Sequence, residues 1–247
     1  MATVERLRIV TYNVHRCVGR DGQLSPSRII RVLSAMAPDI VALQELDVNR
    51  PRTGYADQAS LIARGLGIEN RYFFPAHARQ HEHFGDAILT RLPMRLMRAG
   101  HLPTLPGYPH LERRGAIWVA IDWQETPIQI MTTHLGLWNR ERLLQVDALL
   151  GSEWLRHEAC QAPVILCGDF NAVPGTRAYR RLRTVLHDPV PWGVWPPGTF
   201  PSRYPILPID HILLSADWEV HRIEKPRTRL SRMASDHLPL LAEVSLR

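Results

Sequence analysis

The sequence has 247 residues, with 45% hydrophobic and 22% charged side chains, so composition excludes a disordered chain and a fibre. Its formal net charge is +6, and almost all of the 30 basic residues are arginine. A basic protein attracts anionic ligands. Because the arginines are scattered, and their number is also typical of a skewed genome base composition, the charge is only weak support for an anionic substrate and does not single out DNA.

Cysteine usage and hydropathy limit the cellular setting. The three cysteines, Cys17, Cys160 and Cys167, are odd in number and form no CxxC pair, so we expect neither a disulfide framework nor a zinc–thiolate site. The first residues contain no apolar signal core, and no stretch approaches the ~20 apolar residues of a membrane span. A cytoplasmic protein without a transmembrane segment is therefore predicted.

Short runs rich in Val, Ile and Leu predict eight strands, and helical spacing of apolar residues predicts three helices between them. The strands are expected at 7–12, 40–43, 87–90, 116–121, 128–132, 164–167, 212–214 and 238–244, and the helices at 28–36, 57–66 and 139–158. Strand–helix–strand order favours an α/β protein, and consecutive strands favour antiparallel portions. We expect one domain over residues 1–247, with the Pro- and Trp-rich stretch 189–208 as a loop within it.

Acids, amides and histidines that could bind a metal or take part in catalysis lie at the ends of these strands. One group follows its strands: Asn13, Gln44, Glu45, His134, Asp169 and Asn171. The other group precedes its strands: Asp86, Asp210, Asp236 and His237. If the strands of the second group run antiparallel to those of the first, all these side chains meet at one rim, where ligand sites of α/β proteins gather.

A rim of this kind favours a metal ion. Its five acids are Glu45, Asp86, Asp169, Asp210 and Asp236, and carboxylates this close together repel one another. A divalent cation removes the repulsion, and the oxygen-rich donors favour Mg²⁺ or Mn²⁺ over zinc. Glu45 is the best single candidate ligand.

The histidines at the rim predict hydrolysis by water. His237 follows an acid directly, and Asp210 could hold its second ring nitrogen, as in catalytic triads. The sequence contains no Gly-x-Ser-x-Gly motif and no P-loop, so water is the implied nucleophile. A metal ion, His134, Asn171 and His237 could together supply the charge neutralisation and proton relay of phosphoryl transfer.

Seven segments in order along the chain resemble the endonuclease/exonuclease/phosphatase family, whose members include deoxyribonuclease-I-like nucleases. The segments are 11–13 (TYN), 43–45 (LQE), 85–89 (GDAIL), 133–135 (THL), 168–171 (GDFN), 209–212 (IDHI) and 235–239 (SDHLP). Each is weak alone, but seven in order are specific. The resemblance implies a four-layer α/β/β/α sandwich of two packed mixed β-sheets flanked by helices, with the site at one end of the sheets.

The resemblance also implies roles for the metal and the water. Glu45 is expected to be the main metal ligand, helped by Asn13, with Asp236 as a possible second contact. Asp169 and Asn171 are expected to orient the attacking water and the phosphate.

Further roles follow for the histidines. His134 is expected to donate to a phosphate oxygen. His237, held by Asp210, is expected to act as a general base or as a cationic stabiliser. One departure from the family pattern is Asp86, which stands where Asn is usual and adds either repulsion towards phosphate or a further metal contact.

Four more residues are candidates for substrate binding, each with a structural alternative. Arg114 meets phosphate at the rim or belongs to a solvated edge. Trp138 forms a wall of the site or packs against the long helix. Trp195 and Phe200 lie in a stretch that forms either an apolar platform beside the phosphate pocket or a stiff loop.

The sequence thus predicts a metal-dependent hydrolase, a phosphodiesterase or nuclease acting on nucleic acid, a phospholipid headgroup or a small phosphodiester. The first alternative is a phosphomonoesterase for an inositol or sugar phosphate. The second alternative is a non-catalytic module that binds phosphate or nucleic acid.

Overall fold

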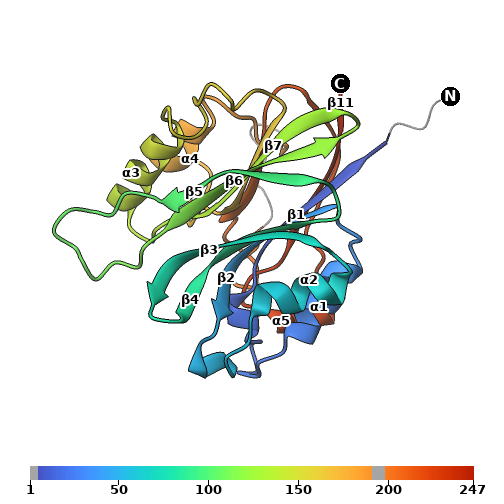
Figure 1. Cartoon of the computed structure of the whole chain (residues 1–247), viewed down its shortest axis with the longest axis vertical. Coiled ribbons are helices and arrows are strands. Elements are labelled where there is room, and N and C mark those ends of the chain that lie inside the picture. The colour runs from blue at the N-terminus through green and yellow to red at the C-terminus, as the bar shows by residue number, and fades with distance from the viewer. Residues whose placement is uncertain (1–4, 191–197) are drawn as a thin grey trace.

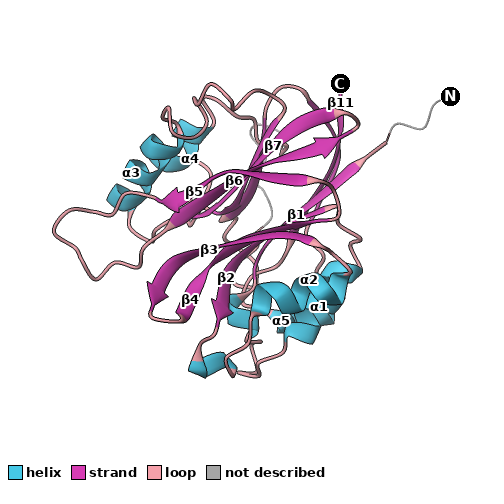
Figure 2. Ribbon diagram, in the orientation of Figure 1, coloured by secondary structure: helices cyan, strands magenta, loops and turns pink. Residues whose placement is uncertain are grey.

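Two mixed β-sheets pack face to face, and helices cover the outer face of each sheet (Figures 1 and 2). The computed structural model describes residues 5–190 and 198–247. This arrangement is the four-layer α/β/β/α sandwich that the sequence predicted. β1 and β11, from opposite ends of the chain, pair in one sheet.

The six-stranded sheet has the order β10-β11-β1-β2-β4-β3, and the five-stranded sheet has the order β5-β6-β7-β8-β9. The first contains β1 (Leu7–Asn13), β2 (Ile40–Val48), β3 (Asn70–Arg79), β4 (Glu82–Thr90), β10 (Trp218–Glu224) and β11 (Leu240–Leu246). The second contains β5 (Met94–His101), β6 (Gly115–Trp123), β7 (Thr126–His134), β8 (Val164–Asp169) and β9 (Asp210–Leu214).

The helices divide between the two outer faces (Figure 2). The six-stranded sheet is covered by α1 (Pro26–Ser34), α2 (Gln58–Leu66) and α5 (Arg229–Ala234), and the five-stranded sheet by α3 (Asn139–Leu149) and α4 (Arg177–Leu182). Two short 3₁₀ turns, η1 (His15–Cys17) and η2 (Pro51–Thr53), follow β1 and β2. Three apolar layers result, one between each pair of adjacent layers of secondary structure.

Successive side chains of a strand point to opposite faces of the sheet, so every second residue packs into the same apolar layer. In β1, Val10 and Tyr12 pack under the helices, whereas Leu7 and Ile9 face the second sheet. Asn13 has the same parity as Leu7 and Ile9, so it points into the same inter-sheet space at the end of the strand. The other central strands follow this pattern, so the inter-sheet layer is apolar for most of its length and polar at one end.

Strand directions bring the predicted rim together. β1 runs parallel to β2, and β7 runs parallel to β8, so their polar C-terminal residues lie at the same end of the molecule. The strands that carry or follow Asp86, Asp210 and His237 are β4, β9 and β11, and each runs antiparallel to its neighbour from the first group. The proposed meeting of both groups of residues is therefore confirmed.

Several element boundaries differ from the sequence prediction. The helix expected over 139–158 ends at Leu149, and the chain then turns at Gly151, a poor helix former, so that Trp154 packs into the core. β3, β5 and β10 were not predicted because they are edge strands with many half-exposed polar residues. The short helices α4 and α5 were also missed.

Cys17, Cys160 and Cys167 are free thiols. Within residues 5–190 and 198–247, no helix has the length and apolar character needed to cross a membrane.

Bulges in β2 and β3, on either side of β4, explain the glycine at position 85. Gln44 and Glu45 of β2 together oppose Asp86, and on the other side the β3 ladder shifts beside Gly85. A Cβ atom at Gly85 would lie 1.9 Å from the carbonyl oxygen of Phe74, so no other residue fits without moving the backbone.

We therefore expect Gly85→Ala to lower the free energy of unfolding by about 3 kcal/mol, because the clash is with backbone rather than with a flexible side chain. Gly100→Ala is the matched control, since a Cβ at that strand glycine meets its nearest atom at 3.9 Å. Urea unfolding of both variants measures the difference. Equal stabilities would show that the bulge is not a packing constraint.

Candidate active site

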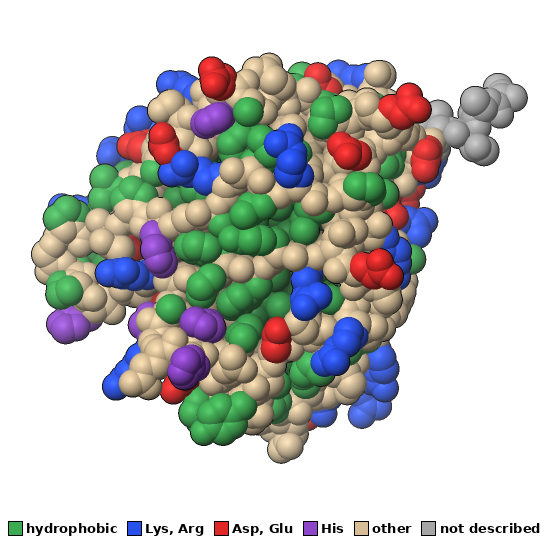
Figure 3. Space-filling view, viewed as in Figure 1, with side chains coloured by type: hydrophobic (Ala, Val, Ile, Leu, Met, Phe, Trp, Pro, Cys, Tyr) green, Lys and Arg blue, Asp and Glu red, His purple; other side chains and the backbone are tan. Residues whose placement is uncertain are grey.

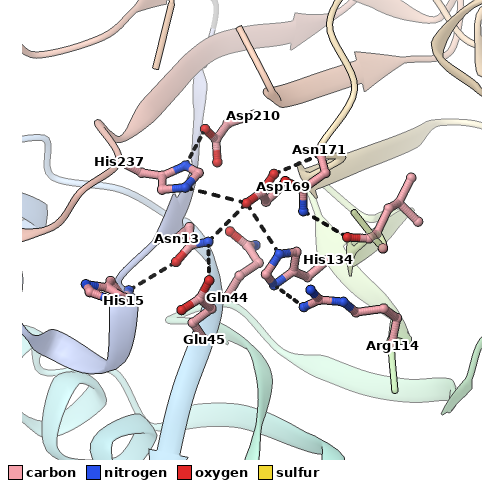
Figure 4. Close-up of polar contacts among 12 residues, drawn as sticks. Asn13, His15, Gln44, Glu45, Arg114, His134, Asp169, Asn171, Asp210 and His237 are labelled. Carbon is pink, nitrogen blue, oxygen red and sulfur yellow. Dashed lines mark hydrogen bonds and ion pairs between the residues drawn. The ribbon is translucent and has the colours of Figure 1, made fainter. Parts of the chain in front are cut away.

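The polar end of the inter-sheet layer opens into a cavity of about 800 Å³. Eight of the residues singled out in the sequence line it: Glu45, Arg114, His134, Asp169, Asn171, Phe200, Asp236 and His237. Asn13 and Asp210 lie directly behind this lining and hydrogen-bond to members of it. Figure 4 shows the side chains of both sheets converging on Asp169.

Asn13 connects the two sheets at the floor of the site. Its side-chain Nδ2 donates to Glu45 Oε1 at 2.9 Å and to Asp169 Oδ2 at 3.0 Å, while its Oδ1 accepts from the backbone of His15 at 3.0 Å (Figure 4). Because all its hydrogen-bonding groups are engaged and it is fully buried, the amide has one orientation. It fixes Glu45 relative to Asp169.

The β2 bulge aims Glu45 at the cavity. Its backbone is left-handed, with φ of 61°, which non-glycine residues rarely adopt. β2 does not end before Glu45, as the sequence suggested, but continues to Val48. The bulge turns this one side chain without ending the ladder, a use of bulges that is common beside functional sites.

Asp86 lies behind Glu45 and is not part of the cavity lining. Its Oδ1 accepts from the Glu45 backbone N–H at 3.4 Å, and the side chain is buried. Burial raises the pKa of Asp86 to about 8, against the opposing effect of the Arg114 charge. A protonated Asp86 adds no negative charge, and so no repulsion towards phosphate, at neutral pH.

Asp169 is the centre of the hydrogen-bond network. Its Oδ2 lies 3.4 Å from His134 Nε2 and 3.7 Å from His237 Nε2, and its Oδ1 accepts from the Asn171 backbone at 2.9 Å. Burial and the nearby charge of Asp210 raise the pKa of Asp169 to about 7. Asn171, with a left-handed φ of 48°, donates its Nδ2 to the Leu135 carbonyl at 2.9 Å, which orients its amide at the cavity wall.

His237 is held as a partner of two acids. Its Nδ1 lies 2.8 Å from Asp210 Oδ2, and its ring centroid lies 4.8 Å from that of Phe200, with the two rings tilted by 44°. Burial alone lowers the pKa of His237, but the charges of Asp210 and Asp169 outweigh burial and raise it to about 10. This arrangement favours the imidazolium form.

His134 is in the opposite electrostatic setting. Arg114 Nη1 lies 2.9 Å from His134 Nδ1, and because a guanidinium only donates, Nδ1 must be the acceptor. The ring proton of a neutral His134 is therefore on Nε2, which points at Asp169. Burial and the Arg114 charge lower the pKa of His134 well below its usual value. His134 is thus a neutral hydrogen-bond donor.

The donor set fits a divalent cation. Within the described ranges, Asp169, Asp210 and His237 offer ligand atoms that all lie within 4.8 Å of one another, and this buried group could bind a divalent metal. Asp210 Oδ1 is buried with no hydrogen-bond partner. Glu45 and Asp236, the carboxylates that the sequence predicted as metal ligands, are not in this group, although both line the cavity.

Three predicted substrate-binding residues need separate comment. Arg114 lines the cavity, and its side chain contacts His134 and, at 2.8 Å, Glu112. Trp138 is absent from this lining and contacts Tyr108 at the neighbouring surface, with ring centroids 5.2 Å apart. Trp195 lies outside the described residues.

The sequence reasoning did not identify several basic residues of the cavity. They are His15, Arg16, Arg50, Arg52, His77, His110 and Arg113. His15 and Arg16 directly follow β1, and Arg50 and Arg52 follow β2, so proximity to a strand end was the available signal.

Relatives and solved structures resemble this chain over most of its length. The uncharacterized protein YbhP of Escherichia coli K12 is 29% identical over 174 residues, 66% of this chain and 64% of YbhP, so the match spans under two thirds of that relative. The catalytic domain of human nocturnin, solved with bound sulfate, has a TM-score of 0.74 at 22% identity, covering 98% of this chain and 94% of its own.

A mannosyl-6-phosphatase of Bacteroides thetaiotaomicron has a TM-score of 0.74 at 19% identity, covering 97% of this chain and 100% of its own. At such identities the likeness of solved structures establishes the fold alone. The sequence profile of the endonuclease/exonuclease/phosphatase family matches residues 10–237, which include every segment that first suggested it except the last two residues of 235–239. The chain therefore belongs to the endonuclease/exonuclease/phosphatase family.

Proposed function

We propose that this protein is a divalent-metal-dependent phosphodiesterase that cleaves its substrate with an activated water. The family consists of hydrolases that act on phosphate esters. The observation that carries the proposal is the position of Asp169, whose Oδ2 lies within 3.7 Å of Asn13 Nδ2 and of two histidine ring nitrogens. Asp169 therefore contacts an amide, a neutral histidine and a histidine that is paired with Asp210. This arrangement is suited to hold water and phosphate in line for attack.

Glu45 and Asp236 would hold the ion, and Mg²⁺ or Mn²⁺ suits their oxygen donors. Asn13, predicted as a further ligand, would help by positioning Glu45, because its Oδ1 already accepts from the His15 backbone. When bound, the ion supplies charge neutralisation at the phosphate and at the carboxylates around it. The Asn13 hydrogen bond to Glu45 Oε1 keeps that carboxylate in place before the ion binds.

The side chains divide the remaining work. Asp169 and Asn171 orient the water for attack on phosphorus, opposite the leaving ester oxygen. His134 donates its Nε2–H to a phosphate oxygen, a role that its contact with Arg114 supports. His237, positioned by Asp210, accepts a proton from the water as a general base or stabilises the phosphate as a cation.

The size of the cavity supports a diester. A volume of about 800 Å³ far exceeds one phosphate group and leaves room for substituents on two ester oxygens. The Phe200 ring forms an apolar wall beside His237. Nucleic acid, a phospholipid headgroup and small phosphodiesters are the candidate substrates, and a cytoplasmic location stays a prediction from cysteine usage.

Removal of the metal ligand tests the cofactor. Glu45→Gln should lower kcat/KM on bis-p-nitrophenyl phosphate at least about 100-fold, because charge stabilisation of the transition state is lost. EDTA should abolish turnover, and added Mg²⁺ or Mn²⁺ should restore it in the wild type. Glu69→Gln, an exposed acid outside the cavity, is the control and should stay active. Full activity in EDTA would contradict the metal requirement.

The Asp–His pair is tested by two substitutions. His237→Ala should lower kcat about 100- to 10,000-fold, as expected for loss of a proton-transfer group. Asp210→Asn should cost about 10- to 100-fold, since it positions the ring without touching substrate. His187→Ala, at an exposed histidine, serves as the control. Unchanged rates in both variants, with unfolding temperatures near that of the wild type, would favour the non-catalytic binding module.

A substrate panel separates the diester from the monoester. With Mg²⁺, the protein should hydrolyse bis-p-nitrophenyl phosphate with a higher kcat/KM than p-nitrophenyl phosphate. Plasmid DNA, abasic DNA, RNA and phospholipid vesicles then narrow the class of diester. A preference for the monoester would reject the diesterase in favour of an inositol or sugar phosphatase.

A further inference from the structure

One part of the cavity wall is basic. It is formed by side chains from η1, from the loop after β2 and from the 102–114 loop: Arg16, Arg50, Arg52, Arg113 and Arg114. Figure 3 shows arginine and histidine side chains gathered at the notch between the 102–114 loop and the β3–β4 hairpin. Arg52 and Glu45 line the same cavity, so the basic wall adjoins the proposed metal ligand.

Carboxylates of the protein pair with three of the five arginines of this wall. Arg52 holds Asp47 with two contacts of 2.7 Å, and Arg114 holds Glu112 at 2.8 Å. Arg50 shares Asp47 at 3.7 Å, and its 3.5 Å contact with Glu82 is an ion pair without a hydrogen bond.

Arg16 and Arg113 are the two arginines left over. Neither has a carboxylate partner within residues 5–190 and 198–247. The contact of Arg16 is with a neutral acceptor, His15 Nε2, and its buried Nε–H has no acceptor at all. The protein therefore leaves two arginines of the cavity wall, the half-buried Arg16 and the exposed Arg113, without a carboxylate partner.

The backbone of η1 is an independent indication. His15, Arg16 and Cys17 have φ of 46°, 56° and 58°, three consecutive non-glycine residues in the left-handed region. Each costs roughly 1–3 kcal/mol and persists only where the surroundings impose it. Here Gln58 Nε2 holds the Arg16 carbonyl at 2.6 Å, and Asn13 Oδ1 holds the His15 N–H. The strained turn thus sets the direction of Arg16 beside the Asn13–Asp169 centre.

We propose that this wall is a subsite for a second phosphate, so that the substrate is a compact organophosphate with one scissile ester and one further phosphate group. The inference rests on the proposed function for the scissile ester. Guanidinium groups bind phosphate oxygens in pairs, and a dianion would supply the charge that Arg16 and Arg113 lack. A bounded cavity rather than a basic stripe along the surface favours a compact ligand over a polymer.

Binding of matched ligands tests the subsite without requiring turnover. Isothermal titration should compare thymidine 3′,5′-bisphosphate with thymidine 5′-monophosphate, and inositol 1,4-bisphosphate with inositol 1-monophosphate. At least one bisphosphate should bind about tenfold or more tightly than its monophosphate, and the pair that shows this identifies the source of the phosphate. Arg16→Gln combined with Arg113→Gln should reduce this preference to about twofold or less.

Arg64→Gln, an exposed arginine on α2 outside the cavity, should keep the preference and the hydrolysis rate. Equal affinities within both pairs, or a preference that survives the double substitution, would overturn the second-phosphate subsite. Wild-type hydrolysis of bis-p-nitrophenyl phosphate is measured in parallel. Hydrolysis without tighter binding of either bisphosphate would contradict the second-phosphate subsite alone. Tighter binding of a bisphosphate without any hydrolysis would contradict the proposed phosphodiesterase and still support the subsite.

Discussion

Asn13 is the point at which the two sheets and the two halves of the site meet. Its amide donates to Glu45 of its own sheet and to Asp169 of the other sheet, in a position with no access to water. A buried amide that loses its partners costs free energy, so the sheets must keep the spacing that satisfies it. Nearby, Gln44 Nε2 donates across the same gap to Thr132 Oγ1 at 3.1 Å. These contacts hold the polar end of the inter-sheet layer in register.

The site also depends on opposing electrostatic settings for two similar side chains. His134 faces a guanidinium and stays neutral, whereas His237 faces two carboxylates and favours its charged form. Both rings point at Asp169, so one acid receives a neutral donor on one side and a cation on the other. Two histidines with separate tasks can therefore work a few ångströms apart.

Bulges and strained turns direct side chains into the cavity at positions where a regular strand would place them elsewhere. Glu45 leaves the β2 ladder with a left-handed backbone, and Gly85 allows the neighbouring strands to close around that bulge. Arg16 is directed by the turn after β1 in the same way. Free energy is lost locally at each of these positions and is offset by the three apolar layers of the sandwich.

The sequence by itself determined the layers and most of the central residues. β1, β2, β7 and β8 contain runs rich in Val, Ile and Leu that end in polar residues, so these strands and the polar residues at their ends could be predicted directly. The seven ordered segments then indicated the family and the sandwich. Edge strands such as β5 were not predicted, because a half-exposed strand needs no continuous apolar run. The helix beginning at Asn139 was predicted too long, because Trp154 can pack into the core from a helix or from a turn.

Only the tertiary structure decided how these residues act on one another. Contacts between segments distant in sequence place Arg114 against His134 and Asp86 behind Glu45. They also bring Arg16, Arg50 and Arg113 to one wall of the cavity. Burial and the sum of nearby charges set pKa values, and neither can be read from a strand's own residues. The sequence supplied the chemical groups, and the packing of the two sheets decided which of them are charged, paired or left to meet a ligand.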